Sequence, residues 1–391
     1  MNTAETVRSR REFITATAAT LALVSSGALA ANVAAGKVLK AAVVGHTGRG
    51  DYGHGLEKIF ANCPGVELVA LADPDEAGRK RGSERIGAPR SYPSHRELLE
   101  RERPQLVSVA MRHADLHFEI VRDCLLAGAH VYCEKPFVTG PDQADALLME
   151  AKKRRLKIAV AHTMRMMPVT VRLREAMREG LLGELVEMRA HGKQDARAGG
   201  EDLIVLGSHL FDLMRMFAGD PISCSARVLE KGRDITRDDR RSVKDNVGLV
   251  AGDEVFADYA FGNGVHATFT STAKLRETMG HWGIELLGTK GVARINCDIS
   301  PNVFIRRSGG WTAKGKSDAW EPLDAELIQS APEHNLGPVG DWLDAVAKDR
   351  EPECSGRNGA WAVEMVSAVY QSALTKGRVA FLLNSRAHPL A

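Results

Sequence analysis

Residues 38–50 read VLKAAVVGHTGRG, an apolar run that leads directly into a glycine-rich turn. A second apolar run, VELVALAD at residues 66–73, ends on an aspartate. Further apolar runs follow at residues 106–110, 131–133 and 158–161, with helical patterns between them. Uninterrupted apolar strands that alternate with helices are typical of parallel sheets covered on both faces. The first half of the chain is therefore predicted to be a doubly wound α/β domain.

The glycine-rich turn GHTGRG, at residues 45–50, lies where the first strand should pass into a first helix. Its first and third glycines fit the dinucleotide fingerprint of the Rossmann fold, and a helix beginning beyond the turn would offer free N–H groups to phosphates. Thr47 occupies the position of the second glycine, so we expect Gly48 to allow the close approach of the pyrophosphate. Asp73, about 20 residues further on, is the predicted ribose ligand and favours NAD.

A basic run leaves NADP open as the alternative cofactor. Arg79, Lys80 and Arg81 follow Asp73 closely, and cations there could contact a 2′-phosphate, although an exposed helix face explains them equally well. The residues expected to bind the cofactor are Gly45, Thr47, Gly48, Arg49, Gly50, Asp73, Glu134 and Lys135.

The N-terminus has the pattern of an export signal. Residues 9–14 read SRREFI, an Ala-, Thr- and Leu-rich stretch follows, and ALA stands at residues 28–30. Paired arginines before an apolar stretch and a small-residue cleavage site are typical of twin-arginine signals. An amphipathic first helix is disfavoured because residues 13–36 carry no charge and so offer no polar face. We therefore expect a signal peptide over residues 1–30 and a mature protein that is periplasmic or otherwise exported.

Composition excludes several classes of partner. Lys and Arg total 52 against 50 Asp and Glu, and a net charge of +2 gives no field for nucleic acid or for a membrane surface after signal cleavage. The 44% of apolar residues fits a globular enzyme with a small-molecule partner. The six irregularly spaced cysteines are expected to be mostly buried thiols. We find no cluster with convincing metal-ligand spacing, so no metal is predicted.

Several short motifs make the resemblance to a known family specific. Residues 134–136 read EKP, after HFE at 117–119 and AGAHV at 127–131, and GSHLFD stands at 207–212. With RMMP at residues 165–168 and GLLGE at 180–184, the mature chain resembles the Gfo/Idh/MocA family (glucose-fructose oxidoreductase and inositol dehydrogenase type) over nearly its whole length. The resemblance implies that Lys135 lies between nicotinamide and substrate, where an ammonium could bind and polarise the reacting oxygen.

The second half alternates between polar and apolar residues at 186–195, and further strands are predicted at residues 255–261, 265–271, 284–287 and 292–297. This period predicts an open, mostly antiparallel sheet with one polar face. The resemblance implies that relatives pair through this sheet, so a homodimer or homotetramer is expected. The expected parts are an NAD-binding Rossmann domain at 37–162, a substrate and oligomerisation α+β domain at 163–335, and C-terminal helices at 336–391 that pack back on the first domain.

Residues 201–218 are predicted to form one helix with Asp202, Val205 and His209 on a shared face. The resemblance implies that His209 accepts the proton of a substrate hydroxyl, a role suited to the near-neutral pKa of imidazole. Relatives with dehydrogenase activity commonly have an aspartate four residues before this histidine, where this chain has Val205. Asp202 could supply the missing acid–base group, or could serve only the start of the helix. Together with His209, Arg165 and Lys193 are the expected substrate-binding residues, with His162 and His334 as weaker candidates.

Three functions follow from these residues. The first is an NAD(P)-dependent oxidoreductase acting on a CH–OH group of a sugar, a sugar derivative or a cyclitol. The second is a lyase or glycosidase that uses retained NAD for transient oxidation. The third is a nucleotide-binding protein that has lost catalysis, which Val205 permits. Export favours a tightly bound cofactor, because free NAD is scarce outside the cytoplasm.

Overall fold

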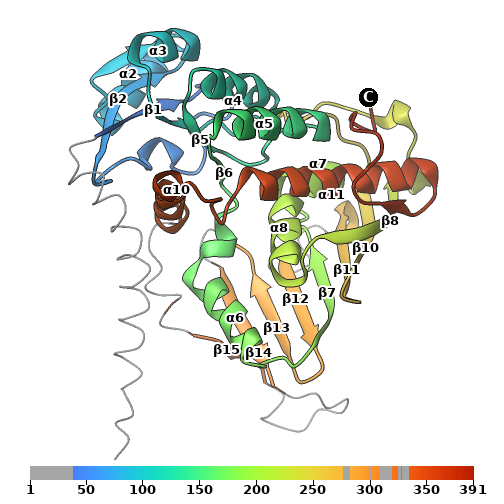
Figure 1. The fold of residues 1–391 in the computed structure, drawn as a ribbon. Coiled ribbons are helices and arrows are strands. Elements are labelled where there is room, and N and C mark those ends of the chain that lie inside the picture. Colours follow the sequence, from blue (N-terminus) through green and yellow to red (C-terminus); the bar gives the residue numbers. More distant parts are fainter. Residues whose placement is uncertain (1–37, 276–281, 299–300, 308–318, 325–326, 328–333) are drawn as a thin grey trace, which may run out of the picture.

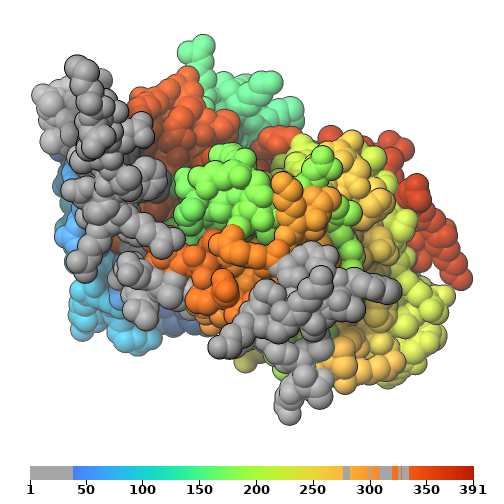
Figure 2. Space-filling model, turned by 90° about the horizontal axis from the view of Figure 1, so that it is seen from below, coloured from blue at the N-terminus to red at the C-terminus, as the bar shows by residue number. Residues whose placement is uncertain are grey.

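The computed structural model describes residues 38–275, 282–298, 301–307, 319–324, 327 and 334–391. The predicted signal peptide lies outside these residues. The described chain forms two sheets, with the first half of the molecule in blue to green and the second in green to orange (Figure 1). In the space-filling view from below, the two halves lie side by side (Figure 2).

The first sheet has six parallel strands in the order β3-β2-β1-β4-β5-β6, which is the predicted doubly wound arrangement. Five strands coincide with predicted apolar runs, whereas β3 was not predicted because its three residues are polar and mostly exposed. The strands are β1 (Leu39–Val44), β2 (Val66–Ala72), β3 (Arg90–Tyr92), β4 (Leu106–Val109), β5 (His130–Cys133) and β6 (Ile158–Val160). The helices between them are α2 (Glu76–Ile86), α3 (His95–Glu102), α4 (His117–Leu126) and α5 (Pro141–Arg154).

The connection from β1 to β2 does not contain the helix that was expected after the glycine-rich turn. Residues 45–65 contain only a short 3-10 turn, η1 (Leu56–Lys58), so no helix N-terminus stands behind the glycine-rich turn. Gly48, Gly50, Gly53 and Gly55 all have φ between 56° and 85°, a left-handed conformation that interrupts a right-handed helix. The face of the sheet where that helix was expected is covered by α10 (Leu336–Lys348), whose buried Trp342 packs against Tyr132 and Phe60.

The second sheet is mixed, in the order β15-β14-β13-β12-β7-β11-β10-β8-β16, and among its described strand pairs only β7–β11 is parallel. The prediction located β7, β10, β11, β12 and β13 but not β8, whose apolar residues are separated by small polar ones. The strands are β7 (Leu185–His191), β8 (Pro221–Glu230), β9 (Arg233–Asp234), β10 (Glu254–Phe261), β11 (His266–Thr272), β12 (Gly283–Gly288), β13 (Val292–Asn296), β14 (Asn302–Arg306), β15 (Glu321–Pro322) and β16 (Val379–Ala380).

Helices cover one face of the second sheet, and the other face is polar. The covering helices are α6 (Pro168–Arg178), α7 (Gly200–Val205), α8 (Gly207–Ala218) and α11 (Gly356–Thr375). On the opposite face Glu285 is paired across the strands with both Arg189 and Arg294. Long α11 also packs against α5 and β6, so it joins the two sheets (Figure 1).

All six cysteines are free thiols, and five of them are buried, as predicted. Among the described residues, no helix combines the length and the apolar character that a membrane span requires.

Candidate active site

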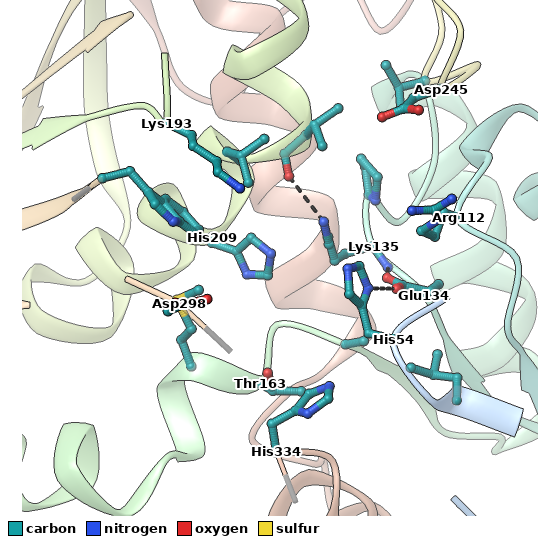
Figure 3. A pocket seen from close by; sticks show the side chains of 18 of the residues that line it. His54, Arg112, Glu134, Lys135, Thr163, Lys193, His209, Asp245, Asp298 and His334 are labelled. Atoms are coloured by element: carbon teal, nitrogen blue, oxygen red, sulfur yellow. Dashed lines mark hydrogen bonds and ion pairs between the residues drawn. The ribbon is translucent and has the colours of Figure 1, made fainter. Parts of the chain in front are cut away.

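A cavity of about 270 Å³ opens at the carboxyl edge of the first sheet, against the second domain. His54, Arg112 and Lys135 follow strands β1, β4 and β5, while Lys193 and His209 come from the second domain (Figure 3). Ligands of open α/β sheets bind at this edge. The cavity is also lined by Arg197, Asp245, Val247, Trp282, Asp298, His334 and Asn335.

Lys135 reaches the cavity from the end of β5 and is almost completely buried. Its Nζ donates a hydrogen bond to the backbone oxygen of Val205 at 3.3 Å. Burial lowers the pKa of Lys135, and the neighbouring Glu134 carboxylate opposes that shift. The side chain therefore contacts the second domain directly, and its ammonium group has few competing partners.

The helix predicted over residues 201–218 is in fact two helices, α7 and α8, which are separated at Leu206. In a continuous helix the N–H of His209 would bond to the carbonyl of Val205. Here it donates to Leu206 at 3.2 Å, which leaves the Val205 carbonyl to accept from Lys135. Val205 cannot supply the carboxylate that the family resemblance implies at this position, but it contributes its backbone oxygen to the site.

The His209 imidazole lies between two other rings, edge-on to Trp282 and to His162, with ring centroids 5.8 and 5.5 Å away. Burial lowers the pKa of His209 well below its usual value, and the charge of Lys135 lowers it further. The ring is therefore neutral near pH 7 and can accept a proton.

Asp202 is not part of the cavity, which corrects its expected role as an alternative acid–base group. The carboxylate is fully buried and accepts hydrogen bonds from the backbone N–H groups of Lys193 and Gln194 and from the Ser271 hydroxyl. These contacts hold the segment that carries Lys193 after β7. Asp202 therefore has a structural role, in which it fixes the position of the segment that carries Lys193.

Of the predicted substrate-binding residues, Lys193 and His209 line the cavity and Arg165 does not. Arg165 is buried in η3 (Thr163–Met166), where its Nε lies 3.3 Å from the Asp212 carboxylate and its Nη1 donates to the Glu353 carbonyl at 2.9 Å. These partners inside the protein correct the expectation that Arg165 binds substrate. His334 lines the cavity, whereas His162 lies behind His209.

Several cavity residues were not found from the sequence. Arg112 follows β4 at the same edge as Lys135, so the strand-end rule could have located it. His54 pairs with the buried Glu134 carboxylate. Burial raises the pKa of Glu134, but His54 and Lys135 outweigh it and lower that pKa to about 2. Arg197 and Asp245 lie in irregular segments and carry no pattern that would have identified them.

In the predicted cofactor turn, Gly48 has free space beside it, whereas the Asp73 carboxylate is already occupied by hydrogen bonds from the protein. Gly48 has a φ of 79° and a side chain built there would meet no atom within 4 Å, so a phosphate has room to approach its backbone. Asp73 is fully buried, and its carboxylate accepts from the Thr47 hydroxyl at 2.6 Å and from the Tyr52 hydroxyl at 2.7 Å. The turn fits a pyrophosphate at Gly48, whereas a ribose at Asp73 must replace one of these partners.

One group of potential metal ligands occurs in the described chain, His95, Glu119 and Asp123. The Arg96 guanidinium contacts both carboxylates of this group. The group is therefore an ion-pair cluster at the surface.

Comparison with known proteins places these observations in a family. Residues 39–162 match the model of an oxidoreductase family with an NAD-binding Rossmann fold, and residues 174–381 match the C-terminal α/β domain of that family. The chain is 24% identical to D-apiose dehydrogenase of Paraburkholderia graminis over 80% of this chain and 83% of that protein. It is 27% identical to trans-1,2-dihydrobenzene-1,2-diol dehydrogenase of Bos taurus over 59% of this chain and 66% of that protein.

The fold is also found among solved structures. Levoglucosan dehydrogenase in complex with NADH and levoglucosan superposes with a TM-score of 0.70 at 18% identity, over 88% of this chain and 99% of that one. An oxidoreductase from Agrobacterium radiobacter in complex with NAD+, L-tartaric acid and magnesium gives a TM-score of 0.66, also at 18% identity, over 88% of this chain and 98% of that one.

Proposed function

The chain belongs to the Gfo/Idh/MocA family of NAD-dependent oxidoreductases, and we propose that it oxidises a CH–OH group of a sugar, a sugar derivative or a cyclitol. The observation that carries this proposal is the position of Lys135 and His209 in one cavity, one from each domain (Figure 3). D-Apiose dehydrogenase and levoglucosan dehydrogenase are named for carbohydrates, which supports a substrate of this class.

When bound, NAD supplies the nicotinamide ring that accepts hydride from the substrate carbon. The residues that would hold NAD are those of the turn around Gly48, together with Glu134 and Lys135. The desolvated Lys135 ammonium, held by the Val205 carbonyl, binds and polarises the reacting hydroxyl oxygen. The neutral His209 imidazole accepts the hydroxyl proton.

The remaining polar groups orient the substrate. Lys193 and Arg197 line the second-domain side of the cavity, and Trp282 lies beside His209. Polar side chains beside an aromatic face suit a ring that carries several hydroxyl groups. Incubation with NAD and a panel of sugars and cyclitols, followed by nicotinamide absorbance, tests the proposal. If no member of the panel gives a net absorbance change, net oxidation is the wrong reaction.

A redox-neutral reaction is the second candidate, and two features favour it. The twin-arginine pattern at residues 9–14 would carry the protein away from free NAD, and Val205 cannot supply a carboxylate at the position four residues before His209. A lyase or glycosidase would oxidise a ring hydroxyl transiently, eliminate a neighbouring group and return the hydride. Product formed without net change at the nicotinamide would select this candidate. Bound NAD with neither outcome would leave a protein that has lost catalysis.

Denaturing the purified protein and identifying the released nucleotide tests whether the cofactor is retained. We expect NAD, because Asp73 follows β2 and export would separate the protein from the cytoplasmic pool. A folded protein that releases no nucleotide and ignores added NAD would contradict the proposal.

We also propose that the polar face of the second sheet is covered by a second copy of the chain in a homodimer or homotetramer. Acidic and basic residues stand opposite one another on neighbouring strands of that face, so a two-fold contact would place an acid of one copy against a base of the other and the reverse. Light scattering that gives a monomer at micromolar concentration would refute this.

A further inference from the structure

Behind His209 lies a second layer of buried polar side chains that the proposed chemistry does not use. His162 precedes η3, and Arg165 lies within it. Asp212 is on α8, three residues after His209 and therefore on the same side of that helix. His162, Arg165 and Asp212 are each at most 6% exposed. Segment η3 packs directly against α8, where the Arg165 Nε lies 3.3 Å from the Asp212 carboxylate and the His162 ring stands edge-on to the His209 ring.

The atoms of this layer have fewer partners than buried atoms usually have. Within the described residues, both ring nitrogens of His162, Nδ1 of His209 and Oδ1 of Asp212 are buried without a hydrogen-bond partner. Buried polar atoms are nearly always hydrogen-bonded, and water bridges them where side chains do not touch. Three of these four atoms belong to the edge-on imidazoles of His162 and His209, whose ring centroids lie 5.5 Å apart, so a water-mediated hydrogen bond can join the two rings.

We propose that His162 and Asp212 are positioning residues that act through His209, with Asp212 supplying by way of His162 the negative charge that Val205 cannot supply. This inference rests on the proposed function of His209. The proton balance is simple: His209 accepts the hydroxyl proton on the nitrogen that faces the cavity and passes its Nδ1 proton through water to His162. The Asp212 carboxylate stabilises the positive charge that His162 then carries.

The charged groups around His162 are consistent with Asp212 stabilising its protonated form. Burial lowers the pKa of His162 to about 4, Asp212 and Glu134 act to raise it, and Lys135 and Arg165 act to lower it. Of these groups, Asp212 has the largest effect after burial. His162 is therefore neutral at rest, and Asp212 is the chief group that favours its charged form.

The relay formed by His209, His162 and Asp212 is tested first in protein without any substrate. In protein labelled with ¹⁵N at histidine, the two ring nitrogens of His209 report its tautomer, and His209→Asn identifies their signals. An acid that orients an imidazole fixes its tautomer. We expect His162→Phe and Asp212→Asn each to change the tautomer ratio of His209 by about threefold or more. The control is His130→Gln, because His130 also has a pKa lowered by burial to about 4 but bonds to Lys157, away from the cavity.

Asp212→Asn leaves the buried Arg165 guanidinium without its carboxylate partner, so this variant can unfold. In that case His162→Phe alone is used to test the relay. Unchanged His209 signals in folded His162→Phe would overturn the relay, whatever the substrate is. With a sugar that the wild type oxidises, we expect kcat of His162→Phe to fall about tenfold or more with KM within about threefold. Full turnover in this variant would also overturn the relay. If the His209 signals respond but no sugar is oxidised, the relay stands and the proposed function fails.

Discussion

The two halves of the cavity are built in different ways. On the first-domain side, Arg112 and Lys135 stand directly after strands of a regular parallel sheet, and Lys135 has Glu134 as its neighbour in the chain. On the second-domain side, His209 follows a break between two helices and is supported by residues far away in sequence, such as Trp282. Residues of the first kind can be identified from a motif, whereas the support of His209 depends on long-range packing.

The largest effect is expected on the first-domain side of the cavity, at Lys135. Lys135→Met should keep the fold and the bound nucleotide but reduce turnover about 100-fold or more, because the reacting oxygen loses the ammonium group that binds and polarises it. Lys157→Met is the matched control. Lys157 is also mostly buried in the first domain, but its Nζ pairs with Asp349 outside the cavity. Wild-type turnover of Lys135→Met on an identified substrate would refute the mechanism and leave the family membership untouched.

The same contrast explains how far sequence reasoning reached. Apolar runs and the EKP motif located five of the six parallel strands and brought Lys135 to the cavity, because both signals are local. The split at Leu206 was not visible, since a single glycine at 207 costs a helix only about 1 kcal/mol and does not by itself end one. In the structure Gly207 lies against the Phe269 ring, a contact between residues far apart in the sequence. For the same reason the absence of a carboxylate at Val205 seemed a defect, while its carbonyl contact with Lys135 could be found only in the structure.

Asp202 and His209 were both predicted as acid–base candidates, and the structure separates them. Asp202→Asn should lower the free energy of unfolding by about 2 kcal/mol, because it removes a buried charge that accepts bonds from Gln194 and Ser271. Its turnover should stay within about threefold of the wild type. His209→Ala should do the opposite, with little effect on unfolding and about 100-fold lower turnover. Denaturant titrations and steady-state rates of both variants check this, and a large kcat loss in Asp202→Asn would return the acid–base role to Asp202.

The buried layer behind His209 should also appear in the pH dependence of stability. The folded-state pKa of His162 is about 4, below the ordinary value of 6.5, so unfolding takes up a proton in this range. The stability contribution is complete above pH 6.5 and falls as pH drops toward 4. Between pH 7 and 5 the wild type should lose about 2 kcal/mol more than His162→Phe in urea titrations. Equal losses would mean that His162 is not buried in its neutral form.

The smallest expected effect concerns the cofactor turn, where the sequence predicted a ribose ligand and the structure has a closed contact. Asp73→Ala should weaken NAD binding about tenfold, but that result alone does not separate a ribose ligand from a residue that holds the turn. Tyr52→Phe separates them, because the Tyr52 hydroxyl occupies one Asp73 oxygen at 2.7 Å. If ribose replaces Tyr52 on that oxygen, the variant should bind NAD as tightly as the wild type or up to about threefold more tightly by calorimetry. Tyr92→Phe is the matched control, since Tyr92 bonds to Glu102 at the edge of the same sheet. Weaker binding in Tyr52→Phe alone would identify Asp73 as a residue that holds the turn, and the ribose would then need another ligand.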